Sequence, residues 1–395
     1  MTKKTPEKKC LIVTSVSSMV GQFMMPNIDL LMSLGYDVTV ATNFEFGSTF
    51  DSACANELLN ALEKKNVIIC NVSFVRSVFS FKNITAYRQI KKLVDKNNYS
   101  LIHCHSPIGG VIARLVARKK RSFGTKVIYT AHGFHFFKGA SLVNWFLYYF
   151  TEKYLSKITD ILITINKEDY DFACRKMQAS KIRYVHGAGV DTKKFSEPVV
   201  DAKTKRNEIG IPLNSDVLIS VGELTKRKNH QVIIKTMGKM KTKDLYYVIC
   251  GQGKRIAGLR NLCRRLNLQN RVMFLGYRND IADLLCMSNL YVFPSLQEGL
   301  SVSLMEAMAA KLPCVVSNIR GNVDLITDGE GGVLCSVNNI GEYKNAIEKL
   351  VVDIELRQKM GEYNQAVLRK FDTAIVLNQL EKIYNELLFL DSTGH

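Results

Sequence analysis

The sequence contains no apolar run long enough to cross a membrane as a helix. A spanning helix needs about 18 or more nearly unbroken apolar residues, whereas the nearest candidate, residues 142–150, is short and includes Asn144. Lysines at positions 3, 4, 8 and 9 precede an apolar stretch that is too short for a signal peptide, and no small-residue cleavage pattern follows it. We therefore expect a cytoplasmic protein whose chain enters its first strand directly.

Cysteine pairs of the Cys-x-x-Cys type are also missing, although the chain has ten cysteines. Most of them lie within apolar segments, as is typical of buried thiols in a reducing compartment, and we expect no disulfides. No Gly-x-Gly-x-x-Gly motif follows the first apolar segment at residues 11–16. This absence argues against a dinucleotide-dependent oxidoreductase.

Acidic residues are absent between Asp95 and Glu152, and most of the formal net charge of +18 falls within the first half of the chain. The same stretch carries Lys96, Arg114, Arg118, Lys119, Lys120, Arg121, Lys126 and Lys138. A basic surface can bind an anionic membrane, a phosphorylated substrate or nucleic acid. Because these residues lack interleaved aromatic residues and a recognition motif, we do not expect nucleic acid as a partner.

The length of 395 residues is too great for one ordinary core and suffices for two domains. Short β-branched segments alternate with helical ones, which indicates parallel sheets built from βα units. The predicted strands are residues 11–16, 36–41, 66–73, 100–103, 126–130 and 160–165, and then 217–221, 246–250, 272–275, 290–293, 314–317 and 332–335. The sequence thus predicts an α/β protein of two Rossmann-like, doubly wound domains that face a cleft.

The alternation lapses between Val190 and Pro212, and we interpret this segment as a linker. The tail instead has apolar residues at helical spacing, and its apolar face comprises Val376, Leu380, Ile383, Leu387 and Leu390. We expect domains at residues 1–195 and 196–372, followed by a helix and tail at 373–395 that pack back on the first domain.

The strongest candidate for chemistry is a loop that joins an apolar strand to a helix. Gly299, Leu300 and Ser301 would place backbone N–H groups at the start of the helix, where an anion such as diphosphate binds well. Glu298 precedes this helix and Glu306 lies farther along it, so their carboxylates can accept hydroxyl hydrogen bonds on either side of a phosphate group. On spacing alone, two solvated helix charges are the more common explanation. An acid in a glycine loop directly after an apolar strand favours a site.

Four segments together resemble family 4 retaining glycosyltransferases of the GT-B fold, and the resemblance covers essentially the whole chain. They are the Glu-x7-Glu pair Glu298 and Glu306, Val-Gly-Glu-Leu-Thr-Lys-Arg-Lys-Asn at 221–229, Val-Met-Phe-Leu-Gly at 272–276 and Thr-Ala-His-Gly at 130–133. Residues 129–140 and 162–170 are similar to the subset that builds capsular and exopolysaccharide repeat units on a lipid carrier.

The resemblance implies transfer of a sugar from a nucleotide diphosphate sugar, expected to be a UDP-sugar, to a lipid-carrier-linked saccharide, with retention at the anomeric carbon. The basic first domain would hold the enzyme at the anionic inner face of the cell membrane. A nucleotide-sugar 2-epimerase of the same architecture is the alternative. No acid and base set for it stands out beyond His132 and the glutamates.

By the same resemblance, His132, Lys228 and Glu298 are the expected catalytic residues. Lys228 would neutralise the departing diphosphate, Glu298 would hold hydroxyls of the donor sugar, and His132 would lie near the reacting carbon. The expected donor-binding residues are Gly21, in the turn after the first strand, where a glycine lets the chain approach the phosphates closely, Phe274, Leu275 and Gly276 at the base, Gly299, Leu300 and Ser301 at the diphosphate, Glu306 at the ribose, and Arg227. A structural role fits His103, His105 and His135 better.

One position departs from the family pattern. Glu223 stands where the family usually has an arginine that binds the diphosphate. Because a carboxylate repels a diphosphate, either Arg227 takes over this role or Glu223 turns away to pair with a nearby lysine.

Neither a metal nor another cofactor is expected. Asp169 and Asp171 form the Asp-x-Asp pattern that other sugar transferases use to hold a metal, but here they lie at the predicted start of a helix, where acids complement the helix dipole. Another predicted helix, at residues 142–156, either packs in the domain core or reaches the membrane or the acceptor lipid. Its aromatic residues include Trp145, Phe146, Tyr148, Tyr149, Phe150 and Tyr154.

Overall fold

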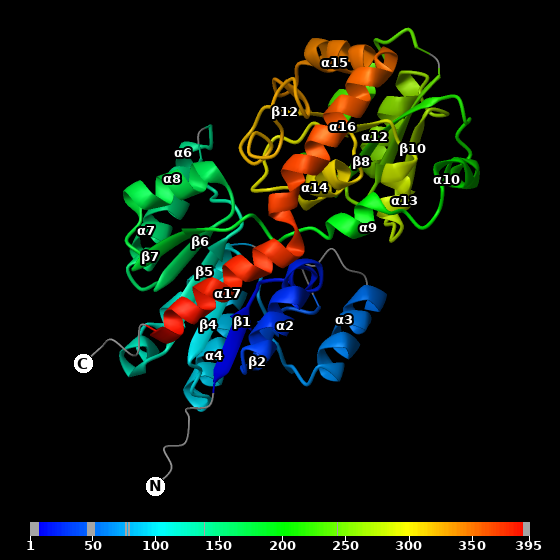
Figure 1. Cartoon of the computed structure of the whole chain (residues 1–395). Helices are drawn as coiled ribbons and strands as arrows, with labels where there is room; N and C mark the ends of the chain where they lie inside the picture. The colour runs from blue at the N-terminus through cyan, green and yellow to red at the C-terminus, as the bar shows by residue number, and fades with distance from the viewer. Residues whose placement is uncertain are drawn as a thin grey trace. The chain divides into compact units, whose positions relative to one another are not determined.

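The computed structural model describes residues 8–45, 52–75, 77, 80–137, 139–242 and 244–389. The chain forms two compact units, one of residues 1–188 with 374–395 and one of residues 189–373 (Figure 1). Among the residues named above, Lys3, Lys4, Lys138 and Leu390 lie outside the described part of the chain.

The first unit is built on a parallel sheet, which has seven strands among the described residues, in the order β3-β2-β1-β4-β5-β6-β7. The strands are β1 (Lys9–Val13), β2 (Asp37–Thr42), β3 (Ile68–Asn71), β4 (Leu101–His105), β5 (Lys126–Ala131), β6 (Ile161–Thr164) and β7 (Lys181–Tyr184). The strand order reverses between β1 and β4. In sheets of this kind, ligands bind beside the carboxyl ends of the strands at such a reversal.

Helices cover both faces of this sheet and complete a hydrophobic core on each side. They are α1 (Ser17–Met19), the π-helix η1 (Val20–Met24), α2 (Met25–Ser33), α3 (Ser52–Lys64), α4 (Lys82–Lys96), α5 (Pro107–Ala117), η2 (Lys120–Phe123), α6 (Leu142–Asn144), the π-helix η3 (Trp145–Tyr149), α7 (Phe150–Ser156), α8 (Lys167–Lys176) and α17 (Thr373–Phe389). The sequence predicts strands β1 to β6 but not β7.

The last helix, α17, packs on the first unit, which confirms the expected return of the chain (Figure 1). Its apolar face joins the core formed by β1, α2 and β6, where Ile383 and Leu387 are buried. The Tyr384 hydroxyl, also buried, donates a hydrogen bond of 2.6 Å to Oδ1 of Asn27 on α2. One face of the first sheet is therefore covered in part by α17.

The second unit repeats this architecture. Among its described residues, six parallel strands form a sheet in the order β10-β9-β8-β11-β12-β13. They are β8 (Asp216–Val221), β9 (Leu245–Cys250), β10 (Val272–Gly276), β11 (Leu290–Phe293), β12 (Cys314–Ser317) and β13 (Gly332–Cys335). The helices are α9 (Thr192–Ser196), α10 (Ala202–Ile209), α11 (Gln231–Met237), α12 (Ile256–Arg265), α13 (Ile281–Cys286), α14 (Val302–Ala309), α15 (Ile340–Val352), α16 (Ile354–Leu368) and η4 (Arg369–Phe371).

The interpretation of residues 190–212 as a linker is wrong, because this segment contains α9 and α10. Each helix has its own start signal: Asp191 accepts a hydrogen bond from the Lys194 N–H, and Asp201 accepts one from the Thr204 N–H. Gly210 ends α10 with a left-handed φ of 74°. The expected domain boundary after residue 195 falls inside α9, which belongs to the second unit.

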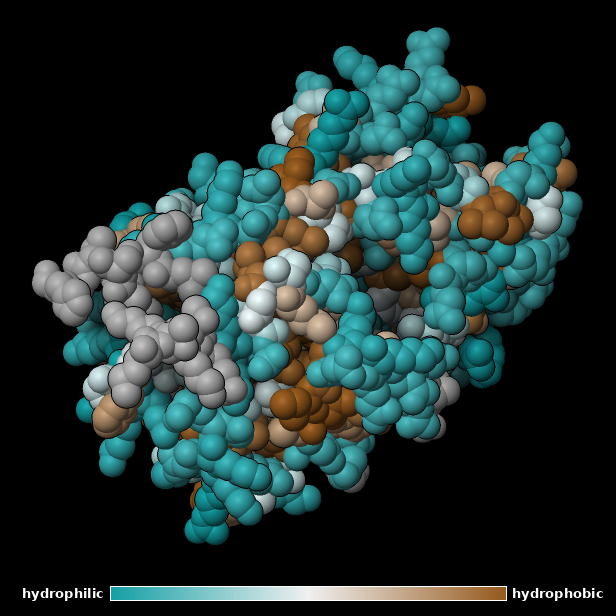
Figure 2. Space-filling view, turned by 60° about the horizontal axis from the view of Figure 1, so that its bottom comes forward, coloured by the Kyte–Doolittle hydropathy of each residue, from teal (hydrophilic) through white to brown (hydrophobic). Residues whose placement is uncertain are grey.

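The aromatic segment at residues 142–156 has two different faces. Trp145, Tyr148 and Tyr149 pack against the core of the first unit, as the core alternative expects. Phe146 and Phe150 are 75% and 58% exposed, and their rings pack on each other at 5.5 Å. Most of the surface drawn in Figure 2 is hydrophilic, with apolar patches between polar side chains. An exposed pair of phenylalanines on one helix therefore calls for an explanation.

The packing of α17 predicts a stability effect at Ile383. Ile383→Ala removes buried methyl and methylene groups, and we expect it to lower the free energy of unfolding of the first unit by about 2–5 kcal/mol. The matched control Ile375→Ala changes the same side chain at a position that is 44% exposed, and it should have little effect. Urea unfolding of the full chain measures both variants. Equal stability losses would contradict the packing described for α17.

Candidate active site

The loop between β11 and α14 lies at the carboxyl end of a fully buried strand. Ser301 caps α14, because its hydroxyl accepts a hydrogen bond from the Leu304 N–H at 3.4 Å. Gly299 and Leu300 directly precede this cap. Another loop approaches Gly299 so closely that a Cβ atom on Gly321, which has a φ of 81°, would lie 2.2 Å from the Gly299 carbonyl oxygen. The start of α14 thus offers backbone N–H groups to an anion.

Glu298, in the same loop, brings two of the predicted cations together. Its side chain is buried, and its Oε1 lies 2.8 Å from Arg227 Nη1 and 2.9 Å from Lys228 Nζ. The Lys228 ammonium also lies 4.3 Å from the centre of the Phe293 ring on β11. The loop after β8 and the loop after β11 therefore meet through one carboxylate.

The pKa shifts of Glu298 and Lys228 have different dominant causes. Burial alone would raise the pKa of the Glu298 carboxyl, but the charges of Lys228 and Arg227 outweigh this effect and hold the pKa below its usual value. At Lys228, burial dominates and lowers the pKa, and Glu298 only partly offsets the shift. Glu298 is thus held as a carboxylate, while Lys228 is a cation that gains from any further negative charge placed beside it.

Glu306 is placed apart from this ion cluster, on the second turn of α14. Burial raises the pKa of its carboxyl to about 7, and the charge of Lys194 on α9 opposes this shift. A carboxyl with this pKa changes its charge near neutral pH. It is therefore suited to exchange between a protonated state and a state that accepts hydrogen bonds from hydroxyl groups.

The predicted base-binding residues lie at the same edge of the sheet. Phe274, Leu275 and Gly276 are the last three residues of β10. Gly276 has a left-handed φ of 71°, and its carbonyl accepts a hydrogen bond from the Gly251 N–H at 2.7 Å. Because the strands are parallel, the carboxyl ends of β8, β10 and β11 all lie at this edge. Phe274 and Leu275 are only partly buried, as a surface that meets a ligand must be.

Two residues at this edge were not singled out in the sequence. Asn229 is buried and donates hydrogen bonds to the Pro294 carbonyl and to Asn338 Oδ1, so it fastens the loop after β8 to the end of β11. Arg320 is buried in the loop after β12 and donates from Nε to the Glu298 carbonyl at 3.3 Å. A charged residue shortly after an apolar strand was a usable signal for Arg320, since it also marked Glu298.

Glu223 lies in the loop after β8, close enough for its charge to raise the pKa of Lys228 slightly against the effect of burial. Gly222 precedes it with a φ of 151°, and a Cβ atom there would lie 3.0 Å from Lys228 Cε. The stem of Lys228 therefore fills the space that a side chain at position 222 would need. Arg227, the expected substitute cation, forms its ion pair with Glu298.

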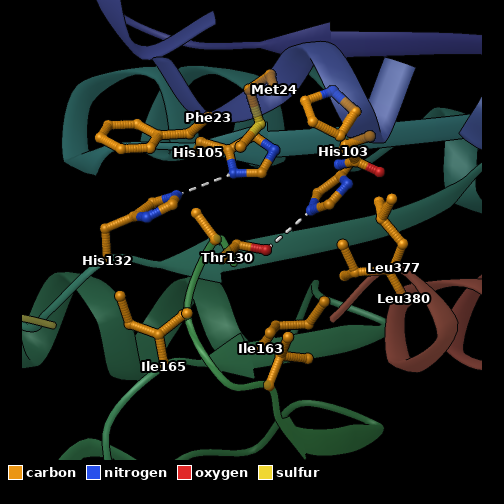
Figure 3. A pocket seen from close by; sticks show the side chains of 15 residues that line it. Phe23, Met24, His103, His105, Thr130, His132, Ile163, Ile165, Leu377 and Leu380 are labelled. Atoms are coloured by element: carbon orange, nitrogen blue, oxygen red, sulfur yellow. Dashed lines mark hydrogen bonds between the residues drawn. The ribbon is translucent and has the colours of Figure 1, made fainter. Parts of the chain in front are cut away.

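In the first unit, His132 directly follows β5 at the carboxyl edge of the sheet. It is partly buried, burial lowers its pKa to about 4, and its Nε2 lies 3.1 Å from Nδ1 of His105 on β4. Both histidines line a pocket together with His103 and Thr130 (Figure 3). The pocket walls are otherwise mostly apolar and include Phe23, Met24, Ile163, Ile165, Leu377 and Leu380.

Gly21 lies in the helical segment and not in the turn after β1, which corrects the expectation. The helical segment begins at Ser17, so Gly21 falls within the π-helix η1. Its φ is not in the left-handed region. A close approach of the turn after β1 to phosphates therefore does not depend on this glycine.

The Asp-x-Asp pattern is part of the local structure of α8. Asp169 is buried and accepts hydrogen bonds from the Phe134 N–H at 2.9 Å and from the Asn166 side chain at 2.8 Å. Asn166 in turn caps the helix by accepting from the Asp169 N–H. Among the described residues, no group of three or more histidine, cysteine, aspartate or glutamate side chains is arranged to hold a metal ion.

Two known proteins with similar sequences are both assigned as glycosyltransferases. The chain is 35% identical over 391 residues to EpsD of Bacillus subtilis (strain 168), a provisionally assigned glycosyltransferase, and 98% of each chain is covered. It is 28% identical over 320 residues to UDP-Gal:α-D-GlcNAc-diphosphoundecaprenol α-1,3-galactosyltransferase of Escherichia coli, with 79% of this chain and 82% of that one covered. Nothing in these comparisons supports the epimerase alternative.

The fold has a counterpart among solved structures. The crystal structure of Anabaena HepE in complex with UDP superposes with a TM-score of 0.77 at 18% identity and covers 96% of this chain and 100% of that one. Family models match on both units: glycosyl transferase 4-like at residues 10–166 and glycosyl transferases group 1 at residues 201–367. Together with the relative that matches nearly its full length, these matches establish that the chain belongs to the family 4 glycosyltransferases and has their GT-B fold.

Proposed function

We propose that this glycosyltransferase moves a sugar, with retention, from a UDP-sugar to a saccharide carried on a lipid diphosphate. The activity named for the Escherichia coli relative supports this choice of donor and acceptor, and HepE supports the nucleotide because it was crystallised with UDP. The observation that carries the proposal is the meeting of Lys228, Arg227 and Glu298 beside the start of α14. This arrangement offers cations and backbone N–H groups to a diphosphate, with a carboxylate next to them.

In this proposal each donor-binding residue meets one part of the nucleotide sugar. Lys228 and the N–H groups of Gly299, Leu300 and Ser301 hold the diphosphate, and Glu298 accepts hydrogen bonds from sugar hydroxyls. Arg227 supplies the second cation that Glu223 cannot provide. The remaining contacts are Glu306 with the ribose, Phe274, Leu275 and Gly276 with the base, Gly21 with the phosphates from the start of η1, and His132 with the transferred sugar.

The reaction is a substitution at the anomeric carbon on a single face. The bond from this carbon to the diphosphate oxygen breaks, and the acceptor hydroxyl oxygen bonds to the carbon from the same side. The hydroxyl proton passes to the departing phosphate oxygen, so no protein base is required. Negative charge grows on the diphosphate as it leaves, and Lys228, whose ammonium is destabilised by burial, interacts more favourably with this charge than with the substrate.

The assignment of Lys228 predicts a large loss of turnover in Lys228→Ala. Removing one preorganised cation or donor at a developing charge lowers kcat by about two to three powers of ten. The control Lys226→Ala alters an exposed lysine of the same loop and should keep turnover near that of the wild type. Release of UDP, measured with whichever UDP-sugar the enzyme accepts from a panel, follows both variants. Unimpaired turnover of Lys228→Ala would refute the assignment.

The raised pKa of Glu306 predicts that UDP binds more tightly as the pH rises. Below about pH 7 the carboxyl is mostly protonated, and above it the carboxylate accepts ribose hydroxyl hydrogen bonds more strongly. Between pH 6 and pH 8 the affinity should rise by roughly five- to tenfold from this group. Calorimetry on the wild type and on Glu306→Gln separates this effect from the titration of UDP itself. The proposal for Glu306 fails if both proteins show the same pH dependence.

We further propose that the first unit docks on an anionic membrane, at the inner face of the cell membrane, through the exposed side of the 142–156 segment. In addition to Phe146 and Phe150, Leu142 and Val143 are largely exposed there. Arg118 donates a hydrogen bond to the Tyr154 hydroxyl and so joins the exposed basic end of α5 to this aromatic face. Among the described residues, no helix has both the length and the apolar character needed to cross a bilayer.

The charge of this surface supports an anionic lipid as the partner. Glu152, the acid that ends the acid-free stretch, is buried and pairs with Arg114 at 2.8 Å, so it does not oppose the surface cations. Arg118 and Lys119 are exposed. Basic residues near an anionic membrane contribute about 1 kcal/mol each, and apolar side chains that enter the interface add to this energy.

Flotation with vesicles tests the docking surface. The double variant Phe146→Ser/Phe150→Ser should lose most binding to phosphatidylcholine vesicles that contain phosphatidylglycerol, and Arg118→Gln/Lys119→Gln should bind severalfold less. The wild type should bind poorly to vesicles of phosphatidylcholine alone. The matched control Val352→Ser removes an exposed apolar side chain from the second unit and should bind like the wild type. Equal binding by the wild type and the phenylalanine variant would overturn the assignment of this surface.

A further inference from the structure

Three histidines form a continuous row at the carboxyl edge of the first sheet (Figure 3). His103 and His105 are two residues apart on β4, so their side chains leave the same face of the strand, and their ring centres are 4.2 Å apart. His132 follows the neighbouring strand β5 and lies next to His105. The row connects the buried interior of the unit to the residue proposed to contact the sugar.

The position of the proton on His103 follows from its hydrogen bonds. The Tyr384 hydroxyl donates to Asn27 Oδ1, so its oxygen is left to accept a hydrogen bond from His103 Nδ1 at 2.8 Å. His103 Nε2 then accepts from the Thr130 hydroxyl, also at 2.8 Å. Because burial lowers the pKa of His103 to about 3, the ring is neutral and carries its single proton on Nδ1.

The bond between His105 and His132 allows two proton arrangements. Burial lowers the pKa of both rings, so each is neutral and has one donor and one acceptor nitrogen. Either His105 Nδ1 donates to His132 Nε2, or His132 Nε2 donates to His105 Nδ1. The two arrangements leave opposite groups on the outer nitrogens of the pair: His132 Nδ1 is protonated in the first and bare in the second.

The other nitrogen of His105 decides between them. His105 is 1% exposed, and its Nε2 has no hydrogen-bond partner among the described residues. In the second arrangement this atom would be a buried N–H without an acceptor, whereas in the first it is a lone pair without a donor. Buried N–H groups are left unpaired less often than acceptors are. The first arrangement is therefore favoured, and both histidines carry their proton on Nδ1.

We propose that His105 is a positioning residue that fixes the tautomer of His132, so that His132 presents its Nδ1–H as a hydrogen-bond donor to an oxygen of the bound sugar. This inference rests on the proposed function of His132. His132 then holds the sugar and does not take its proton. The assignment also gives His105, which the sequence analysis placed among structural histidines, a function in the reaction.

Substitutions at His105 separate donation from packing. In His105→Asn the amide nitrogen occupies the position of Nδ1 and can donate to His132, whereas the carboxylate of His105→Asp, at a pH where it is ionised, has nearly the same shape but can only accept. His105→Leu can do neither. We expect His105→Leu and His105→Asp to lower kcat by about ten- to a hundredfold with little change in donor KM, and His105→Asn to recover most of the loss. Equal kcat values for His105→Asn and His105→Asp would overturn the proposal.

Nitrogen NMR of the wild-type protein provides a test that does not depend on folding of the variants. With ¹⁵N-labelled histidine, His132 and His105 should both show a protonated Nδ1 and an unprotonated Nε2. The spectra of His132→Gln and His105→Leu assign the signals. A protonated Nε2 on His132 would contradict the proposed tautomer whatever the kinetics show.

Measurements of kcat on variants of His132, Lys228 and His105 distinguish failure of the positioning role from failure of the proposed function. If His132→Ala leaves kcat unchanged while Lys228→Ala lowers it, the sugar contact of His132 fails and the positioning role fails with it. If His132→Ala lowers kcat but His105→Leu does not, only the positioning role of His105 fails. UDP affinity, to which the proposed function assigns no contact from His105, should remain near the wild-type value in every His105 variant.

Discussion

The candidate donor site depends on how one buried carboxylate is compensated. A single Glu298 oxygen receives both Lys228 and Arg227, which come from a different loop, and without them an ionised acid at this depth would be strongly unfavourable. The carboxylate therefore ties the loop after β8 to the loop after β11 and keeps two cations close to the start of α14. Removing Glu298 would leave both cations without this partner and would loosen both loops.

Much of this site could be predicted from the sequence, because fully buried parallel strands appear in it as apolar runs. The strands 290–293, 314–317 and 332–335 have the predicted bounds in the structure. Polar residues directly after such runs, above all Glu298, must lie at the carboxyl edge of the sheet. The particular roles of Lys228, Glu306 and His132 came instead from the family resemblance, since spacing alone does not distinguish a site from a solvated face.

The features that could not be predicted from the sequence depend on contacts between loops or on local hydrogen bonds. Arg320 and Asn229 reach the site through hydrogen bonds to the backbone of the β11 loop, and no periodic pattern records such bonds. Asp191 and Asp201 start helices where the lapse in alternation suggested a linker. His105 differs from an ordinary core histidine in its bond to His132 and in its Nε2, which has no hydrogen-bond partner within the described part of the chain.

The return of α17 to the first sheet has a consequence for biosynthesis. Strands β1 to β7 leave the ribosome long before α17, which packs on the core that contains residues of β1 and α2. Until the second unit has been synthesised, the nascent first unit exposes an apolar surface that Ile383, Tyr384 and Leu387 later occupy. The first unit therefore completes its hydrophobic core only after the second unit has been synthesised.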